Sequence, residues 1–263
     1  IARRVESPQV TARLITRVAL PVGLEVGGEG PLGDLTGTAG NWLADDGIAF
    51  DARVELAIAL VAAGVALPEG TVDAVLAAQQ ADGGWNAAGD PEAETVDLVT
   101  TGAVVDLLIQ TGTDPSSAPV GSAMRFIGSN RARRGAWADA EGAPSPAATA
   151  GAIRAIRAVG HDPAGTCWAT EIGLEVGVPS PVAALIALQH ADGHFGGDDP
   201  VRVTSDAVHA LSGRWLPLGR TGDACTPETG GLPFEPSLIV LGAIAVVGVG
   251  GGVRIMRSGS ATA

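Results

Sequence analysis

The chain has 263 residues, of which 46% are hydrophobic and only 3% aromatic, and it contains no tyrosine. This length fits one globular domain with short additional segments, whose core must be built from Ala, Val, Leu and Ile. The formal net charge of −13 excludes a typical nucleic-acid-binding surface, because contacts with phosphates require a basic stripe that releases counterions.

The first segment, residues 1–37, precedes the repeating part of the chain. Within it, residues 8–22 are suited to one helix. The chain begins at Ile1 and has no long apolar stretch typical of an export signal near its start. We therefore expect an incomplete repeat here, in a chain whose N-terminus is processed or truncated.

Residues 38–216 carry a pattern that occurs four times: a polar loop with glycine ends in an aromatic residue and precedes an Ala-rich stretch with helical periodicity. The four aromatic residues are Phe50, Trp85, Trp137 and Phe195. The helices predicted after the loops span residues 51–64, 100–112, 146–160 and 204–213. The helices predicted before the loops span residues 38–44, 70–80, 116–129 and 179–189. Such periodicity is typical of stacked helical hairpins that bury their apolar faces against neighbouring repeats.

Two of the loops carry a recognisable motif. The sequence Gln-Ala-Asp-Gly-Gly-Trp of residues 80–85 resembles the repeat motif of the prenyltransferase and squalene-oxidase family, and residues 189–196 form a second copy. The resemblance covers roughly residues 38–216 and implies an all-α fold, an α/α toroid of helical hairpins. Four hairpins are fewer than close a full toroid in that family, so a partial toroid is expected.

The motif residues have a structural and a functional interpretation. As structural elements, the Asp accepts N–H bonds from the next helix start, the glycines adopt positive φ, and the aromatic residue wedges between hairpins. This interpretation is favoured because one residue set serves every repeat. As lining of a central cavity, the candidate ligand-binding residues are Trp85, Trp137, Trp168, Phe195, Asp82 and Asp192.

An enzymatic function lacks residues to support it. The terpenoid cyclases of the resembling family protonate substrate with an Asp-x-Asp-Asp motif, which is absent here. Its protein prenyltransferases hold zinc with Asp, Cys and His. Residues 206–209 resemble the segment that supplies the His, but the Asp-x-Cys half is missing. His190 and His194 flank a glycine turn and form a weak metal candidate. We therefore assign no catalytic residue, no metal and no cofactor.

One basic cluster stands out in the acidic chain. Arg131, Arg133 and Arg134 precede Trp137, and all 16 basic residues are arginine. We interpret this cluster as a solvated loop face.

The C-terminal part carries a candidate membrane anchor. Leu238–Val253 is uninterruptedly apolar or glycine, near the short end of what spans a bilayer. Arg254 and Arg257 follow the run, and acids only precede it. These flanks predict a transmembrane helix over residues 237–257, with the tail, residues 258–263, in the cytoplasm and the repeat domain outside. A buried core helix is the alternative.

The linker, residues 217–236, contains Thr226, Pro227, Glu228, Thr229 and Gly230. This sequence is similar to the sortase sorting signal of Gram-positive bacteria, with Thr226 where the signal has Leu. Cell-wall attachment and simple membrane retention both remain open.

Cys167 and Cys225 are the two cysteines of the chain. In an extracytoplasmic protein an isolated pair favours a disulfide, and two unrelated buried thiols are the alternative.

These features favour a surface-anchored, non-catalytic binding module of a Gram-positive bacterium. Vertebrate cobalamin carriers share the α/α toroid without catalysis, so a corrinoid is one candidate ligand and a surface protein is another. The alternative is a terpenoid cyclase or prenyltransferase acting on an isoprenoid. A purely structural envelope spacer also remains.

Overall fold

The computed structural model describes residues 7–29, 33–95, 97–131, 135–139, 142–165, 168–169, 179–197 and 199–212. Within these ranges the protein is helical and has no β-strand, only isolated bridges. The prediction of an all-α fold is therefore confirmed.

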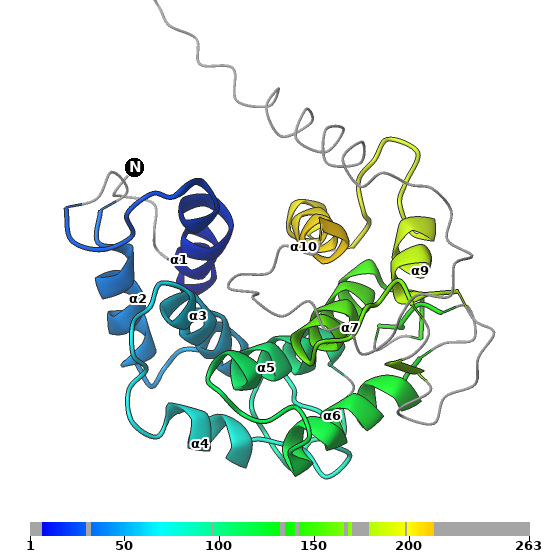
Figure 1. The fold of residues 1–263 in the computed structure, drawn as a ribbon, viewed down its shortest axis with the longest axis horizontal. Helices are drawn as coiled ribbons and strands as arrows, with labels where there is room; N and C mark the ends of the chain where they lie inside the picture. Colours follow the sequence, from blue (N-terminus) through cyan, green and yellow to red (C-terminus); the bar gives the residue numbers. More distant parts are fainter. Residues whose placement is uncertain are drawn as a thin grey trace, which may run out of the picture.

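The helices form two layers around an open arc (Figure 1). The inner layer consists of α1 (Pro8–Arg13), α3 (Phe50–Ala62), α5 (Leu98–Gln110), α7 (Pro146–Ala158) and α10 (Pro200–Ser212). The outer layer consists of α2 (Leu35–Leu43), α4 (Thr71–Ala77), α6 (Ala118–Ser129) and α9 (Pro181–Ala187). The described helices between α2 and α10 alternate between the outer and the inner layer, as the repeat pattern predicts.

The observed helices match the predicted ones to within a few residues. The predicted helix over residues 8–22 is present as α1, continued by the wider π-helix η1 (Leu14–Ala19) and the tighter 3-10 helix η2 (Leu20–Val22). Helix α10 begins at Pro200, four residues before the predicted start at Thr204, because Asp199 caps it by accepting the N–H of Arg202.

The starts of the inner helices are set by short polar side chains. The Asp97 carboxylate accepts the N–H of Thr100 at the start of α5, and the Ser145 hydroxyl accepts the N–H of Ala148 at the start of α7. Each bond satisfies an N–H group that has no partner within the helix. Pro146 at the first turn of α7 adds a pre-set φ angle.

Helices α5 and α7 pack closely because each carries a glycine at their crossing. A Cβ atom at Gly102 would lie 2.1 Å from the carbonyl oxygen of Gly151, and one at Gly151 would lie 2.4 Å from that of Leu98. Two adjacent inner helices are thereby held nearly backbone to backbone.

The apolar core runs between the two layers in three clusters. The largest joins α3 to α7 around Trp85 and Trp137, a second lies among α1, α2 and α3, and a third among α7, α9 and α10. This arrangement leaves the inner side of the arc free of the main core.

In the described part of the chain, no helix combines the length and the apolar character needed to cross a bilayer. The predicted transmembrane segment, the sorting-signal-like residues, Cys167 and Cys225 lie outside the described residues.

Candidate functional site

The loop aromatics are structural anchors of the repeat. Trp85, Trp137 and Phe195 are fully buried, and each donates its backbone N–H to a threonine hydroxyl on the following inner helix. The three acceptors are Thr101, Thr149 and Thr204, at 3.0, 3.1 and 3.0 Å. The two indoles also donate to a carbonyl of the preceding outer helix, Val75 and Ile127, both at 2.7 Å. Trp85 and Trp137 thus tie their loops to the helices before and after them, and Phe195 ties its loop to the helix that follows.

A long polar side chain six residues before the aromatic closes each of these loops. Gln79 donates its amide to the carbonyl of Gly83 at 2.9 Å, and Gln189 does the same to Gly193 at 2.8 Å. In the third loop the Arg131 guanidinium donates to Gly135 at 3.3 Å. The three glycines that accept these bonds, Gly83, Gly135 and Gly193, have positive φ, as predicted. The contacts align Gln189 with Gln79 and not with Gln80, which corrects the motif register by one residue.

Arg131 is not part of a solvated loop face, which corrects the interpretation of the basic cluster. Its guanidinium lies 5.5 Å from the ring centre of Trp137 and 5.1 Å from that of Trp168, and it donates to the carbonyl of Pro179. Cation–π stacking on two indoles gives this arginine a structural role in the place that glutamine occupies in the other repeats. Arg133 and Arg134 lie outside the described residues.

The motif aspartates close their own loops. The Asp82 carboxylate accepts the N–H of Gly84 at 3.0 Å, and Asp192 accepts that of His194 at 3.4 Å. The expectation that they bond the next helix start is therefore wrong, because Asp97 holds the start of α5 and Asp199 holds that of α10. Both aspartates are exposed at the rim of their loops.

None of the six predicted ligand-binding residues borders the polar cavity on the inner side of the arc or the open groove between α3 and α4. Trp168, like the other three aromatics, is fully buried, with its ring centre 5.9 Å from that of Trp137. The structure therefore places the predicted aromatic candidates inside the wall of the arc, where they hold hairpins together.

A polar cavity of about 70 Å³ lies on the inner side of the arc, where α1, η1, α3, α5, α7 and α10 converge. Its charged lining residues are Arg13, Arg17, Asp51, Glu55, Arg154, Arg202 and Asp206. Half of the arginines in the described part of the chain line this cavity, whereas only three of the many Asp and Glu residues in that part do so. Although the chain has a net charge of −13, the described arginines are thus enriched at this cavity.

Arg154 is the centre of a buried ionic triad that joins three inner helices. Its Nε lies 2.8 Å from Asp106 on α5, and one of its terminal nitrogens lies 2.7 Å from Glu55 on α3. Although burial alone disfavours each charge, the two acids raise the pKa of Arg154, and Arg154 with Arg17 lowers the pKa of Glu55. For Asp106 burial outweighs Arg154, and its pKa is raised. Two members of the triad, Glu55 and Arg154, line the cavity.

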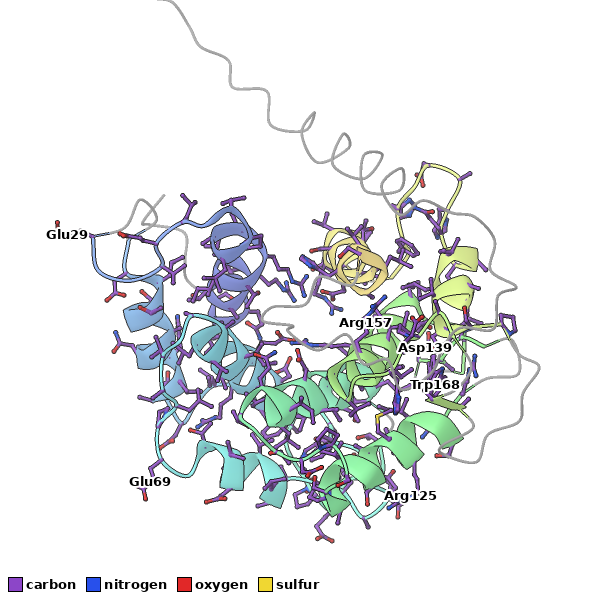
Figure 2. All side chains as sticks on the ribbon, viewed as in Figure 1. Glu29, Glu69, Arg125, Asp139, Arg157 and Trp168 are labelled. Atoms are coloured by element: carbon purple, nitrogen blue, oxygen red, sulfur yellow. The ribbon has the colours of Figure 1, made fainter. Side chains whose placement is uncertain are left out.

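The two ends of the arc meet at the same cavity. Arg17 on η1 lies 2.5 Å from Asp206 on α10 and also donates to the Ser205 hydroxyl at 2.9 Å. Figure 2 shows side chains of both ends reaching into the space between them. Asp206, singled out from the sequence as part of a zinc-site-like segment, instead forms an ion pair with Arg17 and lies 3.6 Å from Arg202.

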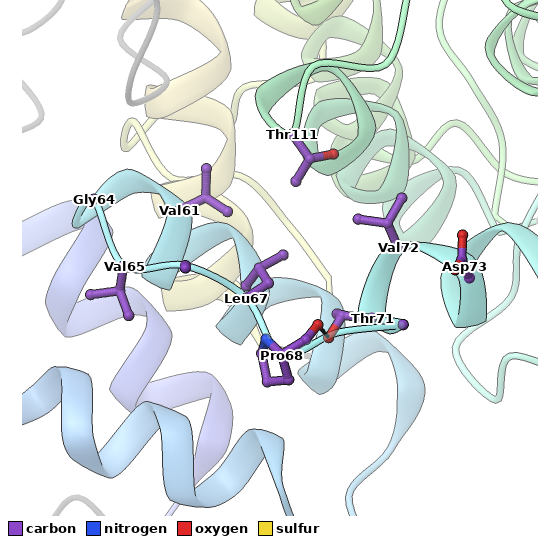
Figure 3. Close-up of a pocket in the computed structure, with 11 residues that line it drawn as sticks. Val61, Gly64, Val65, Leu67, Pro68, Thr71, Val72, Asp73 and Thr111 are labelled. Carbon is purple, nitrogen blue, oxygen red and sulfur yellow. Dashed lines mark hydrogen bonds between the residues drawn. The ribbon is translucent and has the colours of Figure 1, made fainter.

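A second hollow lies on the outside of the molecule, between the end of α3 and the start of α4. It is an open groove of about 480 Å³ bordered mainly by Val61, Leu67, Pro68 and Val72 (Figure 3). Asp73 is its one charged lining residue. The lining of this groove therefore contains few polar side chains that could hydrogen-bond to a ligand.

The histidine pair is stacked, with ring centres 4.3 Å apart and planes within 8°. His194 also lies 2.5 Å from the Asp192 carboxylate. Among the described residues, no group of three or more His, Cys, Asp and Glu side chains is placed to hold a metal.

Most of the cavity residues were missed by sequence reasoning, although a signal was present. Glu55, Asp106 and Arg154 each place a charge among apolar residues on three successive inner helices. Charges in such positions are rarely buried unless they are paired, so their recurrence indicates a shared site.

No protein-family model, no curated protein and no solved structure matches this chain.

Proposed function

We propose that the chain is a non-catalytic binding module of the α/α-toroid type, which takes a small polar ligand on the inner side of its arc. The observation that carries this proposal is the charged cavity where five inner helices converge. Ligand sites typically combine a concave place with a few fixed polar groups. The motif residues, in contrast, are engaged in loop and helix contacts within the repeats.

The toroid is supported by the alternation of inner and outer helices along the arc (Figure 1). The repeated aromatic and threonine bonds indicate that the hairpins are copies of one unit. The arc is partial, and its ends are linked by polar side chains.

The alternative function, isoprenoid chemistry, fits this cavity poorly. An isoprenoid chain needs apolar walls, and aromatic faces stabilise the carbocations that such reactions form. Here the aromatics are buried within the hairpins and the cavity is lined by seven charged side chains. Covering these charges with an apolar chain would desolvate them without new partners.

The cavity size favours a ligand smaller than a corrinoid. Sites for drug-sized molecules have volumes of roughly 300–1,000 Å³, whereas the inner cavity has about 70 Å³. A molecule of a few non-hydrogen atoms suits this space, and a macrocycle would require the arc to open. Binding of a protein partner, in place of a small ligand, is the second version of this proposed binding function.

The location of the module is part of the proposal. The apolar run Leu238–Val253, followed by Arg254 and Arg257, supports a membrane anchor over residues 237–257, and Thr226–Gly230 supports attachment by sortase as a variant of it. In both cases the binding domain lies outside the cell.

The test is native mass spectrometry of the full chain with corrinoids, amino acids, small carboxylic acids, and prenyl diphosphates with zinc. The variant Val99→Trp fills the cavity from α5, and Val201→Trp places the same side chain on the exposed side of α10 as a matched control. We expect an unmodified adduct that Val99→Trp removes and Val201→Trp keeps, with circular dichroism showing that both fold. Turnover of a prenyl diphosphate, or adducts equal in both variants, would contradict the proposal.

A further inference from the structure

The geometry points to a small zwitterion as the ligand of the inner cavity, with its carboxylate on Arg13 and Arg202 and its ammonium group on Asp51. This inference rests on the proposed function and names the ligand class of the same site. It is carried by charges of opposite sign that share one cavity and are not paired with each other.

Arg13 and Asp51 are the two charges in question. Arg13 lies on α1 and Asp51 on α3, and both line the cavity. Within the part of the chain that the structure describes, neither has an ion-pair partner. Both side chains are half-buried. Charges that are withdrawn from water are normally paired, so each indicates a place for a counter-ion.

The remaining charges of the cavity are largely matched already. Arg154 is held by Glu55 and Asp106, and Arg17 by Asp206. Arg202 is the exception, because its guanidinium lies 3.6 Å from Asp206 and 3.9 Å from Asp199, beyond the usual hydrogen-bond length of about 3 Å. Arg202 therefore has donors to offer beside Arg13.

The pKa shifts of Asp51 and Arg13 indicate that the charged form of each side chain is disfavoured when the cavity holds no ligand. Burial, with Asp97 and Glu55 nearby, raises the pKa of Asp51. Burial and the neighbouring Arg17 and Arg202 outweigh the acids around Arg13 and lower its pKa. A bound ammonium group would favour the charged form of Asp51, and a bound carboxylate that of Arg13.

A ligand with a single charge fits less well. A simple anion would pair with Arg13 and Arg202 but would face Asp51 and Glu55 in the same small space. A simple cation would pair with Asp51 and meet the arginines. Like charges in one cavity cost binding free energy, so a ligand that carries both signs is preferred over either half.

The test is isothermal titration calorimetry of the full chain with glycine, β-alanine and 4-aminobutanoate, which vary the distance between the two charges. Propionate and ethylamine are the single-charge controls. We expect at least one zwitterion to bind about tenfold or more tightly than either control. Arg13→Gln and Asp51→Asn should each weaken it by a similar factor, whereas the exposed controls Arg125→Gln and Asp46→Asn should not.

The outcomes separate the inference from the proposed function. Propionate binding as tightly as the zwitterion and unaffected by Asp51→Asn would overturn the zwitterion and leave a simple anion site. If no zwitterion binds but another ligand is removed by Val99→Trp, this inference fails and the binding function stands. If no ligand responds to Val99→Trp, the binding function itself fails. If Arg13→Gln does not fold, Arg13→Lys replaces it as the test. Lysine keeps the positive charge but lacks the planar guanidinium that can donate two N–H groups to one carboxylate, so this variant should still weaken binding.

Discussion

Arg17 on η1 and Asp206 on α10 join the two ends of the described arc through an ion pair of 2.5 Å, and Arg17 also donates to Ser205, 188 positions away in sequence. Both side chains are mostly buried, with 12% and 14% exposure. The inner cavity lies directly beside this pair. The two ends of the arc are thus connected by polar side chains at the very place where we expect a ligand.

Replacing Arg17 with Gln should loosen the two ends of the arc. The loss of bonds to a charged group that is largely withdrawn from water costs about 1.5–3 kcal/mol. In hydrogen exchange we expect faster exchange in α1 and α10 and unchanged exchange at the α5–α7 crossing. Arg125→Gln, whose guanidinium bonds only Ser122 on the surface, is the control. Equal effects on α5 and α7 would mean that the pair stabilises the whole fold and not the ends.

Truncation of Trp85 to Ala should destabilise the protein by about 3–5 kcal/mol, as large aromatic truncations in cores do. Trp85 is fully buried and both of its N–H groups are bonded. Urea unfolding measures the change, and Trp42→Ala, at a half-buried position, should cost less. A stability close to that of the unaltered protein would refute the packing role.

Each threonine that accepts the backbone N–H of a loop aromatic should contribute a similar free energy to the stability of the protein. Thr101→Val and Thr149→Val keep the shape but leave the buried N–H of Trp85 or Trp137 without an acceptor, at a cost of about 1–3 kcal/mol each. Thr111→Val removes only a bond to its own helix and should cost much less. Thermal unfolding of the three variants measures these costs. If only one of Thr101→Val and Thr149→Val lowered the melting temperature, the two bonds would not play the same role in their repeats.

Alanine at Gly102 should destabilise the protein although alanine is the better helix former. Its Cβ would lie 2.1 Å from the Gly151 carbonyl oxygen, and overpacking typically costs about 1–3 kcal/mol. Gly40→Ala is the matched control, because Gly40 lies inside α2 with open space around its Cβ position. That variant should gain roughly 0.5–1 kcal/mol. The difference in denaturation midpoint between the two variants measures the closeness of the α5–α7 crossing.

The triad predicts opposite pH dependences for its two acids. The pKa of Glu55 is lowered in the folded protein, so Glu55 contributes stability that is present above its unfolded pKa and is lost as pH falls through the folded value. The pKa of Asp106 is raised, so its contribution declines as pH rises from its unfolded value through the folded one. Glu55→Gln should therefore flatten the rise of stability with pH in the acidic range, and Asp106→Asn should steepen it. Urea unfolding at a series of acidic pH values measures both, and the same change in slope for both variants would argue against this assignment.

Much of the wall of the arc was predictable from the sequence. The helices around Trp85 and Trp137 were predicted to within a few residues because glycine stops, polar caps and apolar periodicity are local signals. The loop glycines with positive φ were predicted for the same reason. The role of Arg131 was missed, since nothing in its own segment indicates that two indoles lie beneath it.

The repeat, the all-α class and the buried aromatic anchors were determined by the sequence itself, because each depends on residues within one hairpin. The identity of the candidate site was decided only by the tertiary structure. Glu55, Asp106 and Arg154 are separate interruptions of apolar helices until α3, α5 and α7 lie side by side. Arg17 and Asp206 become partners only when the arc brings its ends together. An ionic site built from five helices depends on distances between chain-distant charges, and these exist only in the folded protein.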